Sequence, residues 1–419
     1  MMSNDDMERR LMARLDEKAA SLAPRGLSDA VGERVQRTRQ LPSWATTERW
    51  ISMETRALFG AVPRAIVVLA IMVVLTALAA SAIAIGASLT PKLPDPFGLA
   101  ANGRIAFVSG GDVYTIEPDS TDRQQITSSA QIESSPMWSR DGTGIAYWTD
   151  LDETHSELIV VDADGSDART IAQVAGTEVS RPEWSADGSE VMFSAIVDER
   201  TTTNCRYGAT NGGMCGSRLF AAPTDGSGAR QVGDLDLDAR SPVLSPDGVT
   251  VAFGGGEAGS EALYVMDWDG SDPRPLDGVP ITTGWAFAKQ SWSADGESIA
   301  THDGRSGGAV WLVRRDGSGA TQVSGGPTER LWPSYAPDGS AISWVLWGAG
   351  MEIWFPAEDR LKEIPDITGA EDWSPDATRL VTNGEVEGKL LIIDLDGEIV
   401  QEIDGADDSK ANWQRLAIQ

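Results

Sequence analysis

Short apolar runs alternate with tight polar turns along most of the chain. The runs "IAYW" from Ile145, "VMFSAI" from Val191 and "VAFGG" from Val251 each follow an Asp-Gly pair, and later runs such as "ELIVVDADG" end in another. Apolar runs of about four to eight residues bounded by turn residues predict β-strands. Asp-Gly predicts the tight turn of a hairpin, because glycine adopts positive φ at little cost. The pattern therefore predicts an all-β region of antiparallel hairpins.

One six-residue phrase recurs at a regular interval. "EWSADG" at Glu183 returns as "SWSADG" at Ser291, and looser copies place a large residue at the same point of the phrase. These anchor residues are Trp138, Trp184, Leu244, Trp292, Tyr335, Trp373 and Trp413, separated by 46, 60, 48, 43, 38 and 40 residues. A period of roughly 40–45 residues is typical of a four-stranded β-propeller blade. The phrase is therefore scaffold rather than a duplicated active site.

The third strand of several units is apolar at consecutive positions, as at 158–161 and 390–393. A sheet with one face in water would alternate apolar and polar residues instead. Burial on both faces is what a blade stacked between two neighbours requires. We expect the anchor aromatics to pack in the seams between blades, each burying ~150–250 Å².

The two ends of the repeat region complement each other. The stretch "GRIAFVSGGDVYTIEPDSTDRQQIT" matches strands two to four of a unit, whereas "KANWQR" is an anchor strand without followers. Together they make one blade, so we predict a seven-bladed propeller over residues 102–419, closed by pairing of its terminal strands. In a weaker alternative, residues 97–102 form their own first strand and Trp413 lies on an extra edge strand.

These units resemble the WD-like repeats of TolB-type β-propellers, which read roughly Pro-x-Trp-Ser-Pro-Asp-Gly-x-x-Ile-Ala-Phe and then Ile-Tyr-Val-Met-Asp-x-Asp-Gly. The resemblance covers about residues 102–416 and implies the propeller fold. We expect the chain to lack the separate N-terminal domain of TolB, with a membrane helix in its place. Fold analogy alone does not imply a function.

A charge-free run of 25 residues, 65–89, divides the chain. About 20 apolar residues suffice to cross a bilayer, and a signal peptide would be shorter and nearer the N-terminus. Arg56 and Arg64 flank one end, so the positive-inside tendency predicts a cytoplasmic tail (1–64, with short amphipathic helices). We expect a single-pass cell-membrane protein with a linker (90–101) and an extracytoplasmic propeller.

Charge and cysteines bear on the partners. Residues 89–419 hold 23 Lys/Arg against 54 Asp/Glu, a net charge of −31. This charge would repel phosphate groups and therefore disfavours binding to nucleic acid. The only cysteines, Cys205 and Cys215, lie in one Gly-rich loop, and outside the cytoplasm we expect a disulfide between them.

We expect no metal ion and no cofactor: "DADGSD" at Asp162 and "DWDGSD" at Asp267 read as turns rather than calcium loops, and "GRSGG" around Ser306 lacks a nucleophile elbow.

A binding site is expected on one face of the ring. In a propeller, the loops between second and third strands and the links between blades lie on one face, here named the loop face. The short hairpin turns lie on the opposite face, the turn face. Functional residues gather on loops held by a rigid scaffold. The candidates for the loop face are Asp152, Glu153, His155, Asp234, Asp236, Asp238, Trp285, His302 and Trp347.

The sequence thus predicts a membrane-anchored, non-enzymatic propeller that binds or senses proteins of the cell envelope. The acidic loops of blades two to four favour a basic partner, and residues 65–89 contact lipid. Three alternatives stay open: a glycan receptor that uses exposed tryptophans, an anti-sigma-like membrane regulator with the propeller as sensor, and a propeller enzyme whose acidic channel holds a metal.

Overall fold

The computed structural model describes residues 93–418 except 153, 176–178, 197–215, 234–237, 257–260, 279–289, 304–307, 385–387 and 408–409. The predicted tail (1–64) and membrane span (65–89) lie outside these residues, as do Cys205 and Cys215. In the described ranges, no helix has the length and apolar character that a membrane crossing needs.

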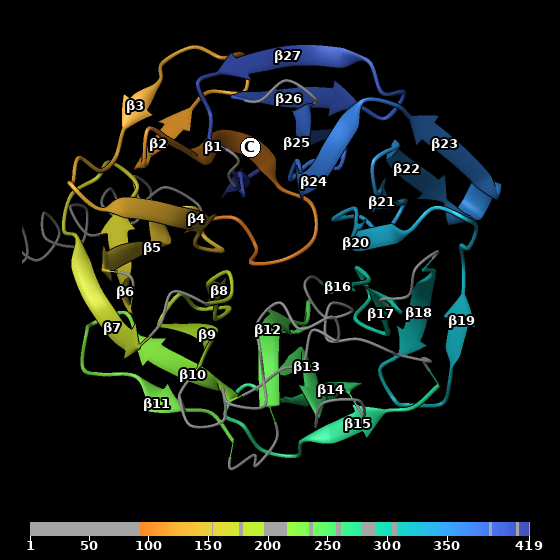
Figure 1. The fold of residues 1–419 in the computed structure, drawn as a ribbon, viewed down its shortest axis with the longest axis horizontal. Coiled ribbons are helices and arrows are strands. Elements are labelled where there is room, and N and C mark those ends of the chain that lie inside the picture. The colour runs from red at the N-terminus through yellow and green to blue at the C-terminus, as the bar shows by residue number, and fades with distance from the viewer. Residues whose placement is uncertain are drawn as a thin grey trace, which may run out of the picture. The chain divides into compact units, whose positions relative to one another are not determined.

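The described residues form seven four-stranded antiparallel sheets, arranged as blades around a central axis (Figure 1). From the axis outwards, blade one consists of β28 (Asn412–Leu416), β1 (Ala101–Ser109), β2 (Asp112–Ile116) and β3 (Gln124–Gln125). The other six blades follow the chain order.

Blade two consists of β4 (Ile132–Trp138), β5 (Gly144–Asp152), β6 (His155–Asp162) and β7 (Arg169–Ala175). Blade three consists of β8 (Glu183–Trp184), β9 (Glu190–Ile196), β10 (Ser217–Pro223) and β11 (Arg230–Gln231). Blade four consists of β12 (Asp238–Leu244), β13 (Thr250–Gly256), β14 (Ala262–Asp267) and β15 (Arg274–Leu276). Blade five consists of β16 (Ser291–Trp292), β17 (Ser298–His302), β18 (Val310–Arg314) and β19 (Ala320–Gln322). Blade six consists of β20 (Arg330–Tyr335), β21 (Ile342–Leu346), β22 (Gly350–Phe355) and β23 (Arg360–Ile364), with a 3₁₀ turn at Pro356–Glu358. Blade seven consists of β24 (Ile367–Trp373), β25 (Arg379–Gly384), β26 (Lys389–Asp394) and β27 (Ile399–Asp404).

The ring closes through the C-terminal strand, as the sequence predicted. Strand β28 pairs antiparallel with β1, with Trp413 opposite Ile105 and Leu416 opposite Ala101. Trp413 is 2% exposed and packs with Phe107 of blade one and Ile392 of blade seven. The alternative, in which residues 97–102 form a separate first strand, is wrong.

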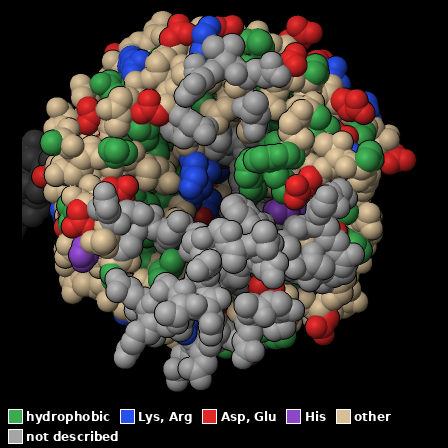
Figure 2. All heavy atoms as spheres, viewed as in Figure 1, with side chains coloured by type: hydrophobic (Ala, Val, Ile, Leu, Met, Phe, Trp, Pro, Cys, Tyr) green, Lys and Arg blue, Asp and Glu red, His purple; other side chains and the backbone are tan. Residues whose placement is uncertain are grey.

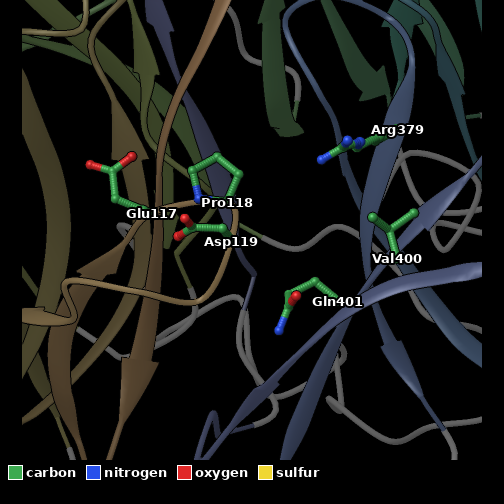
Figure 3. Close-up of a pocket in the computed structure, with 6 residues that line it drawn as sticks. All are labelled: Glu117, Pro118, Asp119, Arg379, Val400 and Gln401. Carbon is green, nitrogen blue, oxygen red and sulfur yellow. The ribbon is translucent and has the colours of Figure 1, made fainter.

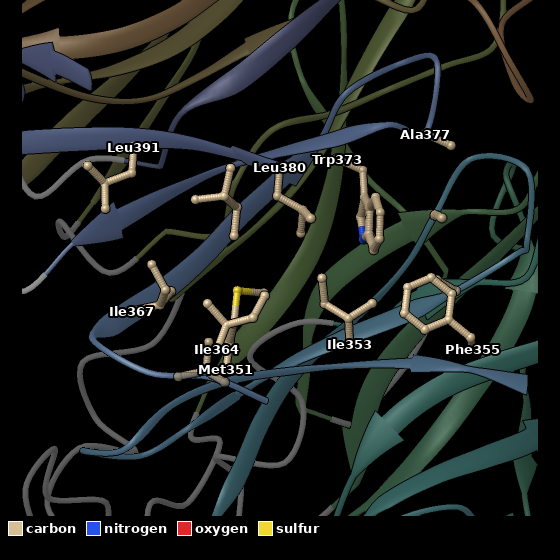
Figure 4. Packing of buried hydrophobic residues seen from close by; sticks show 13 residues of the cluster. Met351, Ile353, Phe355, Ile364, Ile367, Trp373, Ala377, Leu380 and Leu391 are labelled. Atoms are coloured by element: carbon tan, nitrogen blue, oxygen red, sulfur yellow. The ribbon is translucent and has the colours of Figure 1, made fainter. Parts of the chain in front are cut away.

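Large apolar side chains fill the seams between blades. Between blades six and seven, Met351, Ile353 and Phe355 of β22 face Trp373 and Leu380 of the next blade (Figure 4). Six of the seven anchors are buried, and Tyr335 is half-buried against the seam of blades five and six. Burial is worth about 1.5–3 kcal/mol for each large apolar side chain, so the seams stabilise the ring.

Hydrogen bonds between neighbouring blades follow two patterns. In the first, the polar side chain just before an anchor accepts a bond from the backbone amide of the next anchor. The pairs are Asn412 with Trp138 (2.7 Å), Glu183 with Leu244 (3.2 Å), Ser291 with Tyr335 (2.9 Å) and Asp372 with Trp413 (3.0 Å).

In the second pattern, the anchor indole N–H donates to the carbonyl of the residue before the preceding anchor. The pairs are Trp184 to Met137 (3.0 Å), Trp292 to Val243 (3.0 Å) and Trp373 to Ser334 (3.1 Å). The two patterns alternate from one seam to the next around the ring. Because the ring has seven seams, an odd number, the alternation cannot be complete, and the first pattern occurs on both sides of blade one. The indole nitrogens of Trp138 and Trp413 accordingly lack a hydrogen-bond partner among the described residues.

The Asp-Gly turns are held by their own side chains. In blade two, Asp141 accepts bonds from the Ser139 hydroxyl (2.6 Å) and the Thr143 amide (3.0 Å), and blades three and seven repeat this arrangement. In the stretches at Asp162 and Asp267, Asp164 and Asp269 likewise accept bonds from the hydroxyls of Ser166 and Ser271 (2.5 and 2.6 Å) and from their amides (both 2.9 Å). The hydroxyl bonds and then the amide bonds lower the pKa of Asp164 and Asp269, and they support the interpretation of both stretches as turns.

Candidate functional site

The loop face is hollowed at its centre. Figure 2 shows Lys or Arg side chains inside this central hollow, while many Asp and Glu side chains lie towards the edge of the ring. The inner strands of blades three and four carry Arg181, just before β8, and Arg240, within β12. These two arginines lie on the inner wall of a region whose net charge is −31.

Arg181 reaches from blade three across the inner wall of two neighbouring blades. Its Nη2 donates to Met137 Sδ (2.9 Å) in blade two and to the Ala411 carbonyl (3.4 Å) in blade one. Its Nε is buried without a partner among the described residues. A guanidinium has five donors, so Arg181 is only partly satisfied.

Arg240, on the inner strand of the next blade, is half-buried. Ser194 links the neighbours of the two arginines, since its amide donates to Ser180 Oγ (2.8 Å) and its hydroxyl accepts from the Ser241 amide (3.4 Å). Its backbone pairs with Gly254 of β13, but in the part of the chain that the structure describes the Arg240 guanidinium has no hydrogen-bond or ion-pair partner. Two cations with unfilled donors thus occupy the inner wall of blades three and four.

The inner wall also carries strained backbone. Ser135, Ser241 and Trp332 have left-handed φ values of 53–54° and form bulges in β4, β12 and β20. Each lies three residues before its anchor, which is the level of Arg181 in blade three. Non-glycine residues in this conformation cost of order 1–3 kcal/mol and gather at functional sites. Bulges in blades two, four and six therefore lie at this level of the channel.

Blade six contributes an aromatic pair. The ring of Trp332 lies 6.5 Å from that of Trp347 in an edge-to-face arrangement, and Trp347 is 63% exposed. Two residues before Trp332, Arg330 forms an ion pair with the buried Glu352 (2.9 Å), which also accepts a bond from the Trp344 indole.

Residues 93–100, here named the strap, cross the opposite mouth of the channel. Phe97 packs against the turns of blades three and four and lies under Arg140 of blade two, whose guanidinium carbon is 4.7 Å from the ring centroid. The Ala100 amide donates to the Pro375 carbonyl of blade seven (2.9 Å). A segment that touches turns on opposite sides of the ring must cross its centre, so the strap covers the turn-face mouth.

Arg415 of β28 fastens the strap from inside. Its Nη2 donates to the carbonyls of Asp95 (3.1 Å) and Gly98 (2.9 Å). Burial, together with the nearby Arg140 charge, lowers the pKa of Arg415 to about 10. These bonds hold the strap against the turn-face mouth of the channel.

The predicted acidic cluster is partly neutralised. Asp238 accepts bonds from the Arg218 guanidinium (2.8 Å) and the Gly216 amide (2.7 Å). Asp152 bonds to Thr154 and to His155, whose Nδ1 lies 3.2 Å away, and both Asp152 and His155 are exposed. Hydrogen bonds from Thr154 chiefly lower the pKa of Asp152 to about 2. Glu153, Asp234, Asp236 and Trp285 lie outside the described residues.

His302 does not lie on the surface, contrary to the expectation. It is 1% exposed at the end of β17, opposite Val310, in the seam of blades five and six. Neither ring nitrogen has a partner among the described residues, and burial lowers the pKa of His302 to about 4. It is a neutral core residue rather than part of a binding face.

A second hollow lies at the outer seam of blades seven and one. This groove, of about 410 Å³, is lined by Glu117, Pro118, Asp119, Arg379, Val400 and Gln401 (Figure 3). Glu117 is paired with Arg104 (2.8 Å), and Asp119 accepts bonds from Thr121. Its carboxylates are thus already engaged. Across the described ranges, no group of three or more His, Cys, Asp or Glu could hold a metal ion.

Sequence reasoning identified Trp347 but missed Arg181, Arg240 and Trp332. Arg181 and Trp332 share the position three residues before an anchor, which Ser135 and Ser241 also occupy. The residues on either side of this position also vary among the repeats, so no signal in the sequence alone singled out the channel wall.

No protein-family model matches the chain. A stretch of 131 residues is 29% identical to a TolB homolog of Chlorobium luteolum and covers 30% of this chain and 28% of that protein. Over 430 aligned residues the chain is 21% identical to tricorn protease homolog 1 of Streptomyces coelicolor, covering 77% of this chain and 39% of that protein. The matches thus span well under half the length of these relatives.

Among solved structures, the chain is similar to TolB from Acinetobacter baumannii (17% identity, 74% of this chain, 66% of that chain, TM-score 0.45). It is also similar to a prolyl endopeptidase (14% identity, 75% of this chain, 50% of that chain, TM-score 0.52). At such identity the likeness shows the fold alone, and that fold also occurs in enzymes. The absence of enzymatic activity therefore stays a prediction, whereas the resemblance of this chain to TolB-type seven-bladed propellers is confirmed.

Proposed function

We propose that this propeller is a non-enzymatic platform that binds a segment of a protein partner at the loop-face mouth of its channel. One observation carries the proposal: two arginines with unfilled donors and a tryptophan pair, of which Trp347 is exposed and Trp332 half-buried, line a channel that the strap covers at its other end. The turn face, by contrast, is built from turns whose carboxylates bond to their own loops.

The chemistry of the mouth favours a segment that combines a carboxylate with a large apolar side chain. A guanidinium recognises a carboxylate through two parallel hydrogen bonds, and Arg181 and Arg240 have donors to spare. Tryptophan and arginine dominate the binding energy of protein interfaces. The Trp332–Trp347 pair lies on blade six, across the ring from blade three, so the two contacts would orient an extended segment over the mouth.

The acidic loops of blades two to four would act at longer range. Clustered carboxylates steer a basic surface towards the face and raise its association rate. Asp238 contributes little to that field, because Arg218 neutralises it. A partner with a basic body and an acidic, apolar segment would satisfy both regions.

We also propose that residues 65–89 anchor the propeller in the cell membrane, with the N-terminus in the cytoplasm. The support is the charge-free run with Arg56 and Arg64 at one end and an acidic region beyond the other. Protease added to intact cells should remove the propeller and leave the tail. A protected propeller would contradict this topology.

The binding face is tested by photo-crosslinking in intact cells. A photoreactive amino acid replaces either Trp347 on the loop face or Val249, a 52% exposed residue in a turn of blade four. We expect a discrete protein adduct from position 347 and none from position 249. Adducts from position 249 alone would refute the proposal.

A glycan receptor is the second candidate, and the exposed Trp347 favours it. The same crosslinking distinguishes the two: a glycan-binding face would retain cell-wall polysaccharide and yield no protein adduct. Replacing Trp347 with Ala should then abolish polysaccharide retention and leave the protein profile unchanged.

A further inference from the structure

We infer that the turn face of the propeller rests on a lipid surface through an apolar patch at its centre. Four exposed aliphatic side chains form this terminal patch: Leu93, Leu99, Leu416 and Ile418. Leu416 pairs with Ala101, which brings the residues just outside both strands, Leu99 and Ile418, to one edge of blade one. Leu93 precedes Asp95 by two residues, and the Asp95 carbonyl is bound to Arg415 of the same strand β28.

The length of chain between the patch and the predicted span favours this contact. The charge-free run ends at residue 89, and among the described residues Asp95 is the first whose backbone is bonded to the ring. Six residues extend over at most about 20 Å, and the headgroup layer itself takes up about 6 Å on each side. The proposed anchor, on which this inference rests, therefore holds the turn-face centre at the bilayer surface.

Lipid is a better occupant of the patch than a second copy of the chain. The anchor would keep the bilayer at a high effective concentration next to the propeller, so a small apolar patch suffices for contact with lipid. A stable dimer, in contrast, needs about 800 Å² of buried surface from each partner. Carboxylates of the turns, such as Asp141, Asp187 and Asp376, lie on the same face. We therefore expect docking on zwitterionic lipid and weaker docking on anionic lipid at low salt.

Depth-dependent fluorescence quenching tests the contact. The full chain is reconstituted in phosphatidylcholine vesicles that contain lipids spin-labelled near the headgroup. An environment-sensitive fluorescent amino acid replaces Ile418 in the patch or, as a control, Trp347 on the loop face. We expect quenching at position 418 to exceed that at 347 by about threefold or more. It should fall with added Leu99→Ser but not with Ile132→Ser, a change of an exposed loop-face residue.

The possible outcomes distinguish docking of the turn face on lipid from anchoring by residues 65–89. Equal, weak quenching at both positions in protein that floats with vesicles would refute docking and leave the anchor intact. Protein that fails to float would refute the anchor and the docking together. Stronger quenching at position 347 would assign the opposite face to the membrane. A spectral shift at 418 that needs no vesicles and grows with protein concentration would show that the patch binds a second copy.

Discussion

His302 illustrates how single residues of this propeller depend on their seam. An imidazole with two unpartnered nitrogens in an apolar seam is tolerated only while neutral, because burial disfavours its charged form. Asp303 follows it in the chain and offsets this effect only in part. The same seam holds Trp344, Ile342 and Val310. A histidine in this position makes the fold sensitive to acid.

The acid sensitivity has a defined sign and range. The folded pKa of about 4 lies below the ordinary 6.5, so the unfolded chain binds more protons between these values and stability falls as pH drops through this window. The difference corresponds to about 3 kcal/mol of unfolding free energy. His302→Phe should flatten this part of the profile in denaturant titrations at pH 7 and pH 4.

The exposed His155 provides the control. His155→Phe should retain the wild-type pH dependence, because its ring lies in solvent beside Asp152 and Thr154. Equal loss of stability on acidification in wild type and His302→Phe would show that His302 is not the responsible group.

At the level of elements, strand β28 does more than complete blade one. Its Asn412 side chain accepts a bond from the Trp138 amide of blade two, its Trp413 amide donates to Asp372 of blade seven, and its Arg415 binds the strap. Because the seam pattern alternates and the number of blades is odd, blade one takes the same pattern on both sides. The closure therefore coincides with the irregular point of the ring.

Removing β28 should open the ring. Deletion of residues 412–419 exposes the partners of Trp413, whose loss alone is worth ~3–5 kcal/mol, out of a typical 5–15 kcal/mol for a domain. We expect a much lower melting temperature or aggregation of the propeller. Deletion of 417–419 alone, which retains β28, should leave the melting curve close to wild type. If the longer deletion also melts normally, β28 is not the closing strand.

The elements were predictable from sequence because one phrase repeats with the blade period. Strands, turns, anchors and closure follow from the Asp-Gly pairs and from the complementary ends of the repeat. The seam patterns could not be predicted, because whether Glu183 or Asp372 bonds to the next anchor depends on the facing blade. Arg181 and Trp332 were missed for the same reason: their role depends on a channel that several blades build together.

At the scale of the whole molecule, charge is segregated between the outside and the channel. The region from residue 89 onwards carries a net charge of −31, yet the described inner wall presents Arg181 and Arg240. A long-range acidic field and a local basic site act over different distances, since the Debye length is about 10 Å at 0.1 M salt and 3 Å at 1 M. Salt should therefore slow association more than it weakens the bound carboxylate contact.

The central claim is that the channel mouth binds the partner, and one comparison tests it most directly. The adduct formed by the photoreactive residue at position 347 is quantified in the Arg181→Gln, Arg240→Gln double variant and in Arg379→Gln, which changes a turn-face arginine. Loss of a charged hydrogen bond costs about 1.5–3 kcal/mol, so we predict at least roughly a tenfold lower adduct yield in the double variant and no change in the control. Equal yields in the double variant, the control and the wild type would contradict the account.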